Sequence, residues 1–245
     1  MAEFLYFEEL SSTNDYLKEH AEELPDGTVV FADVQTAGKG RLGKSWVTPS
    51  GNISMSMLFR NQSGEVALFP LLCGMAVSTA VERMTGQPVQ IKWPNDIILN
   101  GKKLCGILCE SIVRSSQLHI ICGIGVNVNL RAEQMESSAL PYATSLWMET
   151  GKAYPPVALA KEIALELERT VEIFHKSGFA ALKDVYEQRL INRGRQVQVH
   201  YQQKTVTATA LGVAENGNLL CEAEDGTRFA VNSGEASVRG LYGYV

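Results

Sequence analysis

A glycine- and cation-rich segment at residues 38–45 limits the possible folds of this chain more strongly than any other stretch. It reads Gly-Lys-Gly-Arg-Leu-Gly-Lys-Ser and matches both the P-loop and the glycine fingerprint of dinucleotide-binding folds. Both motifs need a strand before the glycines and a helix after them, because the helix N-terminus holds the phosphate. Residues 28–34 predict the strand, but Pro49 and Gly51 break any helix that would follow. The sequence therefore argues against both nucleotide-binding folds.

The loop lies in a locally positive part of an acidic chain. Residues 53–59 alternate apolar and polar, which predicts a half-buried strand after the loop. No acidic residue occurs at positions 35–64, although the chain carries a net charge of −5. The cations of this stretch create a field suited to an anionic ligand; they are Lys39, Arg41, Lys44 and Arg60. The alternative is a glycine-rich hairpin loop whose cations are simply solvated.

A second dense motif follows at residues 91–110. Asn100 and Gly101 predict a type I′ turn between two apolar runs. We expect Lys92 near the start of one strand of this hairpin, partly enclosed by apolar neighbours, so that its ammonium group needs an anionic partner. The alternative is a lysine whose ammonium group extends to solvent along an apolar stem.

Five motifs, in order and across essentially the whole chain, resemble those of biotin protein ligases. They are Ser12-Thr13-Asn14, residues 35–46, Lys92-Trp93-Pro94-Asn95-Asp96, residues 103–108 and residues 123–129. The usual loop of that family has arginine where this chain has Lys39 and Lys44. Lysine keeps the charge but loses the planar fork that binds phosphate with two hydrogen bonds, whereas Arg41 keeps it.

The resemblance implies a two-step reaction. Such ligases join biotin to ATP as biotinyl-5′-AMP, and then pass biotin to a lysine of a biotin carboxyl carrier protein or domain of a biotin-dependent carboxylase. Adenylation brings a carboxylate to a charged phosphate, so cations must neutralise both groups and water must be excluded. Mg²⁺ is expected with ATP, and the sequence does not identify ligands for it.

The resemblance also implies which residues form the site. Lys92 and Arg41 are the expected catalytic residues. The expected biotin-binding residues are Ser12, Thr13, Asn14, Gln35, Lys39, Gly40, Arg41, Lys92 and Gly106. The expected ATP- and adenylate-binding residues are Gly38, Lys39, Gly40, Arg41, Lys44, Trp46, Asn95 and Asn127. From its local pattern, Ser12 also caps a helix, with Asp15 three residues later. Tyr142 or Trp147 could stack on adenine or pack in the core.

The expected fold is α+β: a mixed sheet flanked by helices, similar to class II synthetases and to lipoate ligases, followed by a small SH3-like β-barrel. We assign residues 1–190 to the catalytic domain and residues 191–245 to the barrel. Helices are predicted at residues 63–86, 155–178 and 179–190 from apolar spacing and flanking Pro and Gly. After residue 192 the strands become short and are separated by turn residues, which favours a closed barrel.

Composition narrows the setting in which the protein works. A pI of about 5.5 argues against nonspecific nucleic-acid binding. No apolar run approaches the ~18 residues needed to span a bilayer, and the acidic N-terminus is not a signal peptide. Five cysteines without a Cys-x-x-Cys pair indicate free thiols in a reducing cytoplasm. The four histidines are scattered along the chain, which argues against a structural zinc site.

Other functions remain open from the sequence. Few residues precede Ser12, so we expect no DNA-binding role. Because the chain has no apolar run of the required length, we also expect no membrane association. An edge strand could pair two copies as a homodimer. The alternatives to a biotin ligase are a lipoate-type ligase or acyltransferase, and a non-catalytic sensor of biotin or its adenylate.

Overall fold

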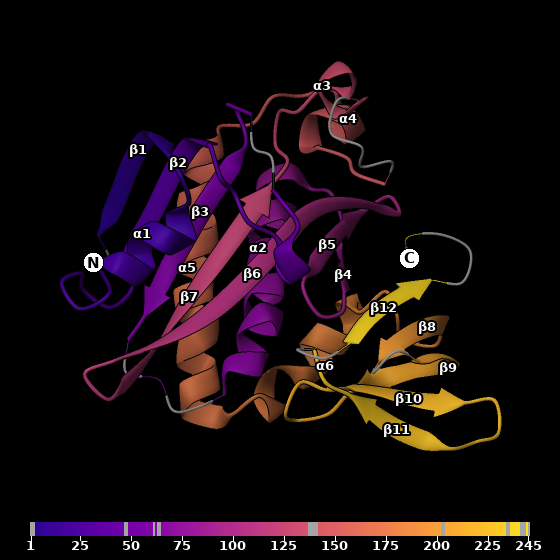
Figure 1. Ribbon diagram of the computed structural model, residues 1–245. Helices are drawn as coiled ribbons and strands as arrows, with labels where there is room; N and C mark the ends of the chain where they lie inside the picture. The colour runs from indigo at the N-terminus through magenta and orange to yellow at the C-terminus, as the bar shows by residue number, and fades with distance from the viewer. Residues whose placement is uncertain are drawn as a thin grey trace.

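The computed structural model describes residues 3–46, 49–60, 62, 65–136, 142–201, 204–233, 236–240 and 244. These residues form two sheets with helices packed mainly on the larger one (Figure 1). The larger sheet has the strand order β1-β2-β3-β7-β6-β5-β4, and the smaller has the order β11-β10-β9-β8-β12. The strands of the larger sheet are β1 (Phe4–Leu10), β2 (Val29–Gln35), β3 (Ile53–Phe59), β4 (Gln90–Lys92), β5 (Asp96–Leu99), β6 (Lys102–Arg114) and β7 (Gln117–Val126).

The larger sheet is mixed, as predicted. β1 pairs with β2 in parallel, and the other pairings between its described strands are antiparallel. The hairpin between β5 and β6 turns at Asn100 and Gly101, whose φ angles of 50° and 76° belong to the predicted type I′ turn. This turn is confirmed. Lys92 lies elsewhere than expected, however, because it ends β4 and not a strand of this hairpin.

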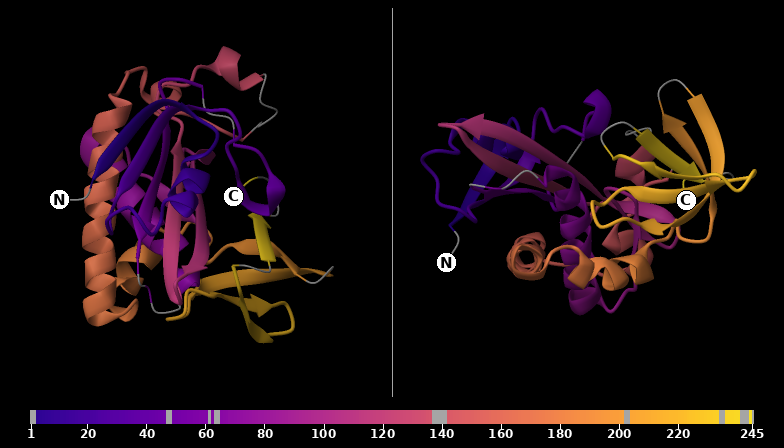
Figure 2. Two further views of the ribbon diagram at one scale, coloured as in Figure 1. Left: turned by 60° about the vertical axis from the view of Figure 1, so that its left-hand side comes forward. Right: turned by 90° about the horizontal axis from the view of Figure 1, so that it is seen from below.

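Two long helices cover one face of the larger sheet. These are α2 (Phe69–Thr85) and α5 (Pro156–Ser177), which lie side by side in Figure 2. α5 begins at Pro156 and α2 has Pro70 in its first turn, and each helix stops at a glycine with positive φ, Gly178 or Gly86. α6 (Ala180–Arg189) follows α5 and leads to the small sheet, and two short helices, α3 (Ala132–Glu136) and α4 (Leu146–Thr150), lie at one end of the molecule.

α1 (Thr13–Glu19) covers part of the opposite face. Its Leu17 packs with Val30, Leu58 and Ile121, whereas the alternate residues of the same strands face α2 and α5. This helix corrects the expectation for β3, all of whose residues are buried. The alternating pattern predicted that the polar residues Ser54 and Ser56 would be exposed to solvent. They lie on the α1 side of the sheet, however, and are buried.

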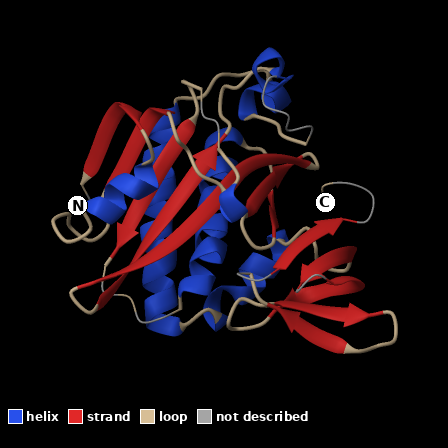
Figure 3. Cartoon of the chain, in the orientation of Figure 1, coloured by secondary structure: helices blue, strands red, loops and turns tan. Residues whose placement is uncertain are grey.

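The small sheet is antiparallel and consists of β8 (Gln196–Tyr201), β9 (Lys204–Val213), β10 (Leu219–Ala223), β11 (Arg228–Val231) and β12 (Ala236–Gly240). The predicted closed barrel is wrong for the described residues, since β11 and β12 form the two outer edges and do not pair (Figure 3). The chain leaves the sheet after β11, and the Ser233 carbonyl accepts a hydrogen bond from Arg41 in the other half of the molecule.

The segment Val66–Thr85 is long and apolar enough, by length and composition, to cross a membrane. It is the core helix α2 with the short turn before it, and 67% of its most apolar window is buried inside the fold. Packing against the sheet and α5 therefore accounts for its composition.

Candidate active site

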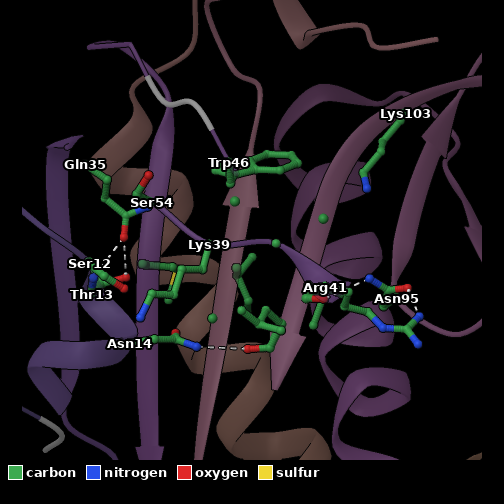
Figure 4. A pocket seen from close by; sticks show the side chains of 18 residues that line it. Ser12, Thr13, Asn14, Gln35, Lys39, Arg41, Trp46, Ser54, Asn95 and Lys103 are labelled. Atoms are coloured by element: carbon green, nitrogen blue, oxygen red, sulfur yellow. Dashed lines mark hydrogen bonds between the residues drawn. The ribbon is translucent and has the colours of Figure 1, made fainter. Parts of the chain in front are cut away.

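A cavity opens between the N-terminus of α1, the loop after β2, and the central strands β6 and β7 (Figure 4). Ten of the predicted site residues line it: Ser12, Thr13, Asn14, Gln35, Lys39, Gly40, Arg41, Trp46, Asn95 and Gly106. The other lining residues are Ser54, Met55, Lys103, Ile107, Leu108, Gly123, Ile124 and Gly125. Six of them lie in the motifs at residues 103–108 and 123–129, but the sequence did not assign them individual ligand contacts.

One wall of the cavity is polar and ordered by its own hydrogen bonds. Gln35 Oε1 accepts from the backbone N–H and the hydroxyl of Thr13, at 2.8 and 3.1 Å. Asn14 Nδ2 donates to Glu110 Oε2 at 2.7 Å, and Ser56 Oγ lies 2.6 Å from Asn14 Oδ1. Ser12 caps α1 by accepting from the Asp15 N–H at 3.4 Å, which confirms the predicted helix start. The wall thus presents fixed donors and acceptors to a small polar group.

The floor of the cavity consists of glycines on β6 and β7. A Cβ at Gly123 would lie 2.3 Å from Asn14 Oδ1, and a Cβ at Gly125 would lie 2.4 Å from Trp46 Nε1. At Gly106 it would lie 2.9 Å from the Trp46 ring. Any larger residue would therefore displace the polar wall or the indole, so glycine is required for this close approach.

The loop that covers the floor is a closed turn. The Trp46 N–H donates to the Gly38 carbonyl at 2.9 Å, and the Gly40 N–H donates to the Lys44 carbonyl at 2.7 Å. Gly43, with φ of 72°, ends a single 3-10 turn at Arg41–Gly43. Among the described residues no helix occurs between this turn and β3. The argument against a P-loop is thereby confirmed.

Cations gather at the end of the cavity opposite the polar wall. Arg41 donates from Nη1 to Asn95 Oδ1 at 2.9 Å and from Nη2 to the Ser233 carbonyl. Lys103 Nζ lies 2.6 Å from Asp96 Oδ1 and 5.5 Å from the centre of the Trp46 ring. Burial lowers the pKa of Arg41, an effect opposed by Asp96. Figure 4 shows this cationic end across the floor from Thr13 and Gln35.

Comparison with known proteins places this geometry in a family. Residues 6–127 match the biotin/lipoate A/B protein ligase family, and residues 194–239 match the biotin protein ligase C-terminal domain. The chain is 33% identical over 229 residues to the bifunctional ligase/repressor BirA of Bacillus subtilis, an alignment covering 91% of this chain and 70% of that protein. The chain belongs to the biotin protein ligase family.

Further members of the family agree with the architecture. Biotin–[acetyl-CoA-carboxylase] ligase of Paracoccus denitrificans is 31% identical over 211 residues, which cover 83% of this chain and 86% of that protein. The structure of the biotin protein ligase of Aquifex aeolicus with biotin and ATP superposes with a TM-score of 0.85 at 29% identity, covering 98% of this chain and all of that one. The α+β fold with a small C-terminal domain is therefore confirmed.

Two lysines of this ligase, Lys92 and Lys103, occupy different positions relative to the cavity. Lys92, predicted to be catalytic, does not line the cavity and is buried, with its Nζ 3.5 Å from the centre of the Tyr244 ring. Burial lowers the pKa of Lys92 to about 8, an effect opposed by Asp96. Lys103, in contrast, lines the cavity. The hairpin turn could have identified it, because the turn pairs Lys103 with Ile98 and puts its side chain on the face of Asp96.

Three other predicted residues lie outside the lining. Asn127 is buried and donates from Nδ2 to the Thr144 carbonyl at 3.0 Å, so it anchors the segment before α4. Lys44 is exposed on the loop. Gly38 closes the turn, since its carbonyl accepts from the Trp46 N–H. Tyr142 is half-exposed and stacks on Tyr244, while Trp147 contacts Arg131.

The described residues that could hold a metal lie apart from this cavity. The sulfur atoms of Cys73, Cys109 and Cys122 all lie within 4.8 Å of one another on the side of the sheet facing α2. Sulfur donors suit soft metals and not Mg²⁺. All five cysteines are free thiols, as predicted. The described lining of the cavity contains no carboxylate, so a magnesium ion there would be held through phosphate oxygens.

Proposed function

We propose that this protein activates biotin with ATP as biotinyl-5′-AMP and transfers biotin to a lysine of a biotin carboxyl carrier domain. One observation carries the proposal beyond family membership. The cavity has a hydrogen-bonding wall at Thr13, Asn14 and Gln35, a glycine floor, and cations at its far end. That order of groups fits a molecule with a polar ring, an apolar chain and a carboxylate.

In this proposal the cations act on the first step. A biotin carboxylate oxygen forms a bond to the α-phosphorus of ATP while the bond from that phosphorus to the bridging oxygen breaks, and pyrophosphate leaves. Arg41 and Lys103 line the end of the cavity at which we place the carboxylate and the α-phosphate, and they would stabilise the negative charge of the transition state. Lys92, which does not line the cavity and lies beside Asp96 on the neighbouring strand, would contribute only at longer range.

The second step uses the loop as a cover. The amine of the acceptor lysine attacks the acyl carbon of the adenylate, AMP leaves, and an amide bond forms. Until the acceptor arrives, water must be excluded from the mixed anhydride. Arg41 links the loop to Asn95 and to Ser233, so it would hold the cover in place. Mg²⁺ would arrive with ATP and be held by its phosphates.

Pyrophosphate–ATP exchange tests the proposal. Exchange should require biotin and should not occur with lipoate or without an acid. Lipoate-specific exchange would instead indicate a lipoate-type ligase. Biotin binding by calorimetry without exchange would indicate a sensor, and either result would contradict the proposal.

We also propose a cytoplasmic homodimer. β1 is an outer edge of the larger sheet, and Tyr6 on it is half-exposed, which suits pairing of two copies. Gel filtration with biotin and ATP should show a dimer, and a monomer under those conditions would exclude the dimer.

The cytoplasmic location is supported by the free thiols, which suit a reducing compartment. Cell fractionation should find the protein with cytoplasmic markers, and recovery with membranes or outside the cell would contradict that location.

A further inference from the structure

Asp96 separates the two candidate lysines at the start of β5. Its Oδ1 is 2.6 Å from Lys103 Nζ, on the cavity side. Its backbone pairs with Lys92 across the β4–β5 hairpin, so the second lysine lies on its other flank. The side chain of Asp96 is only 13% exposed. The direction of this carboxylate therefore determines where the ammonium group of Lys103 lies in the cavity.

Tyr244, next to the end of the chain, reaches this carboxylate from the C-terminal part of the molecule. Its hydroxyl donates to Asp96 Oδ2, the oxygen that Lys103 does not use. Its ring covers Lys92 at 3.5 Å and stacks on Tyr142 at a centroid distance of 5.7 Å. Burial raises the pKa of Tyr244, and Asp96 raises it further, so the hydroxyl keeps its proton and remains a donor.

We propose that Tyr244 is a positioning residue for adenylation, which holds Asp96 so that Lys103 points into the cavity and seals Lys92 from solvent. The proposal rests on the proposed function. The two contacts of Tyr244 have separate roles. The hydroxyl holds Asp96 Oδ2 by a charge-assisted hydrogen bond while Oδ1 forms the ion pair with Lys103, and the ring shields a buried cation.

The same part of the chain supports the cavity at other points. The Ser233 carbonyl accepts from Arg41, and the Gly217 carbonyl accepts from Trp93 Nε1 at 2.9 Å. Arg41 and Lys103, the two cations at the end of the cavity opposite the polar wall, thus depend on contacts from beyond residue 195, Arg41 directly and Lys103 through Asp96. The C-terminal part is therefore a component of the active site and more than a stabilising addition.

A substitution that removes only the hydroxyl of Tyr244 tests its role. Tyr244→Phe keeps the ring, and should lower kcat of biotin-dependent pyrophosphate exchange roughly tenfold while changing the KM for biotin little, since a hydrogen bond to a charged group is lost. Tyr6→Phe is the matched control, because it removes a similar tyrosine–aspartate hydrogen bond, to Asp33, at the far edge of the sheet. It should leave exchange unchanged.

A double-mutant cycle with Asp96→Asn distinguishes positioning from general stability. If Tyr244 acts through Asp96, the double variant should be no slower than Asp96→Asn alone. Multiplied defects, or wild-type kcat in Tyr244→Phe, would overturn the proposal. Absence of exchange in the wild type would instead contradict the proposed function.

Lysine labelling tests the geometry without turnover. With an amine-reactive reagent and mass spectrometry, Lys103 should react faster in Tyr244→Phe than in the wild type. Lys92 should become reactive in Tyr244→Leu, which removes the ring, and should stay protected in Tyr244→Phe. If neither lysine changed its labelling rate between the wild type and the two variants, the proposal would be overturned. This outcome can be read even if the enzyme is inactive.

Discussion

The two ends of the cavity are built in different ways. The polar wall comes mostly from one short stretch, in which Ser12 caps the helix that carries Thr13 and Asn14. The cationic end is assembled from distant segments, with Arg41 bound to Ser233 and Asp96 bound to Tyr244. A wall built locally is fixed once its helix forms, whereas the cationic end is complete only when both sheets are in place. Substrate recognition and catalysis should therefore respond differently to mutation.

The largest effect is expected at the cationic end. Lys103→Ala should lower the rate of biotin-dependent pyrophosphate exchange at least about a hundredfold, because it removes a fixed charge from the cavity. Lys92→Ala should have a smaller effect, since Lys92 is not among the residues that line the cavity and its ammonium group lies under the Tyr244 ring. If Lys92→Ala abolished exchange and Lys103→Ala did not, the assignment of the two lysines would have to be reversed.

The next largest effect concerns retention of the intermediate. Arg41→Gly removes the links from the loop to Asn95 and Ser233, so the adenylate should form but escape, with roughly tenfold more labelling of bystander lysines. Streptavidin blotting of a bystander protein measures this. Lys44→Ala is the matched control because it removes an exposed cation from the same loop. Unchanged adenylate retention in Arg41→Gly would contradict the role of the loop as a cover.

A smaller effect is expected at the polar wall. In Gly123→Ala the new methyl group would meet Asn14 Oδ1, so Asn14 must move away from its hydrogen bond with Glu110. The KM for biotin should rise several-fold, by about 1 kcal/mol of binding energy, with kcat nearly unchanged. Calorimetry with biotin alone would measure the loss of affinity. A lower kcat at unchanged affinity would contradict the assignment of binding to the polar wall and of catalysis to the cationic end.

The smallest effect is on stability at high pH. The pKa of Lys92 falls from 10.5 to about 8 on folding, so between these values the unfolded chain binds more protons than the folded one. The free energy of unfolding contributed by Lys92 should therefore rise with pH from 8 to 10.5. Relative to Lys92→Met, the unfolding temperature of the wild type should rise over this range, by about 2–4 °C for each kcal/mol that Lys92 contributes. A constant difference between the two proteins would show that Lys92 is not desolvated as described.

Local chemistry made much of the molecule predictable. Asn100 and Gly101 specify their turn because both must adopt positive φ, and the flanking proline and glycine residues mark the ends of α5. Ser12 caps α1 for an equally local reason. The ten predicted residues that line the cavity came from motifs whose order matches a known family, so their meeting in space required no knowledge of packing.

Only the tertiary structure decided the rest. Ser54 and Ser56 are buried because α1 covers them, which no alternation within β3 could indicate. Which of Lys92 and Lys103 lines the cavity depends on how their strands pack around Asp96, and the catalytic role of Lys103 is our proposal. Tyr244 meets Asp96 across a separation of 148 residues, and Arg41 meets Ser233 across 192. Contacts at such separations leave no periodic pattern in the chain, because they are set by how the two sheets pack and not by the residues beside them.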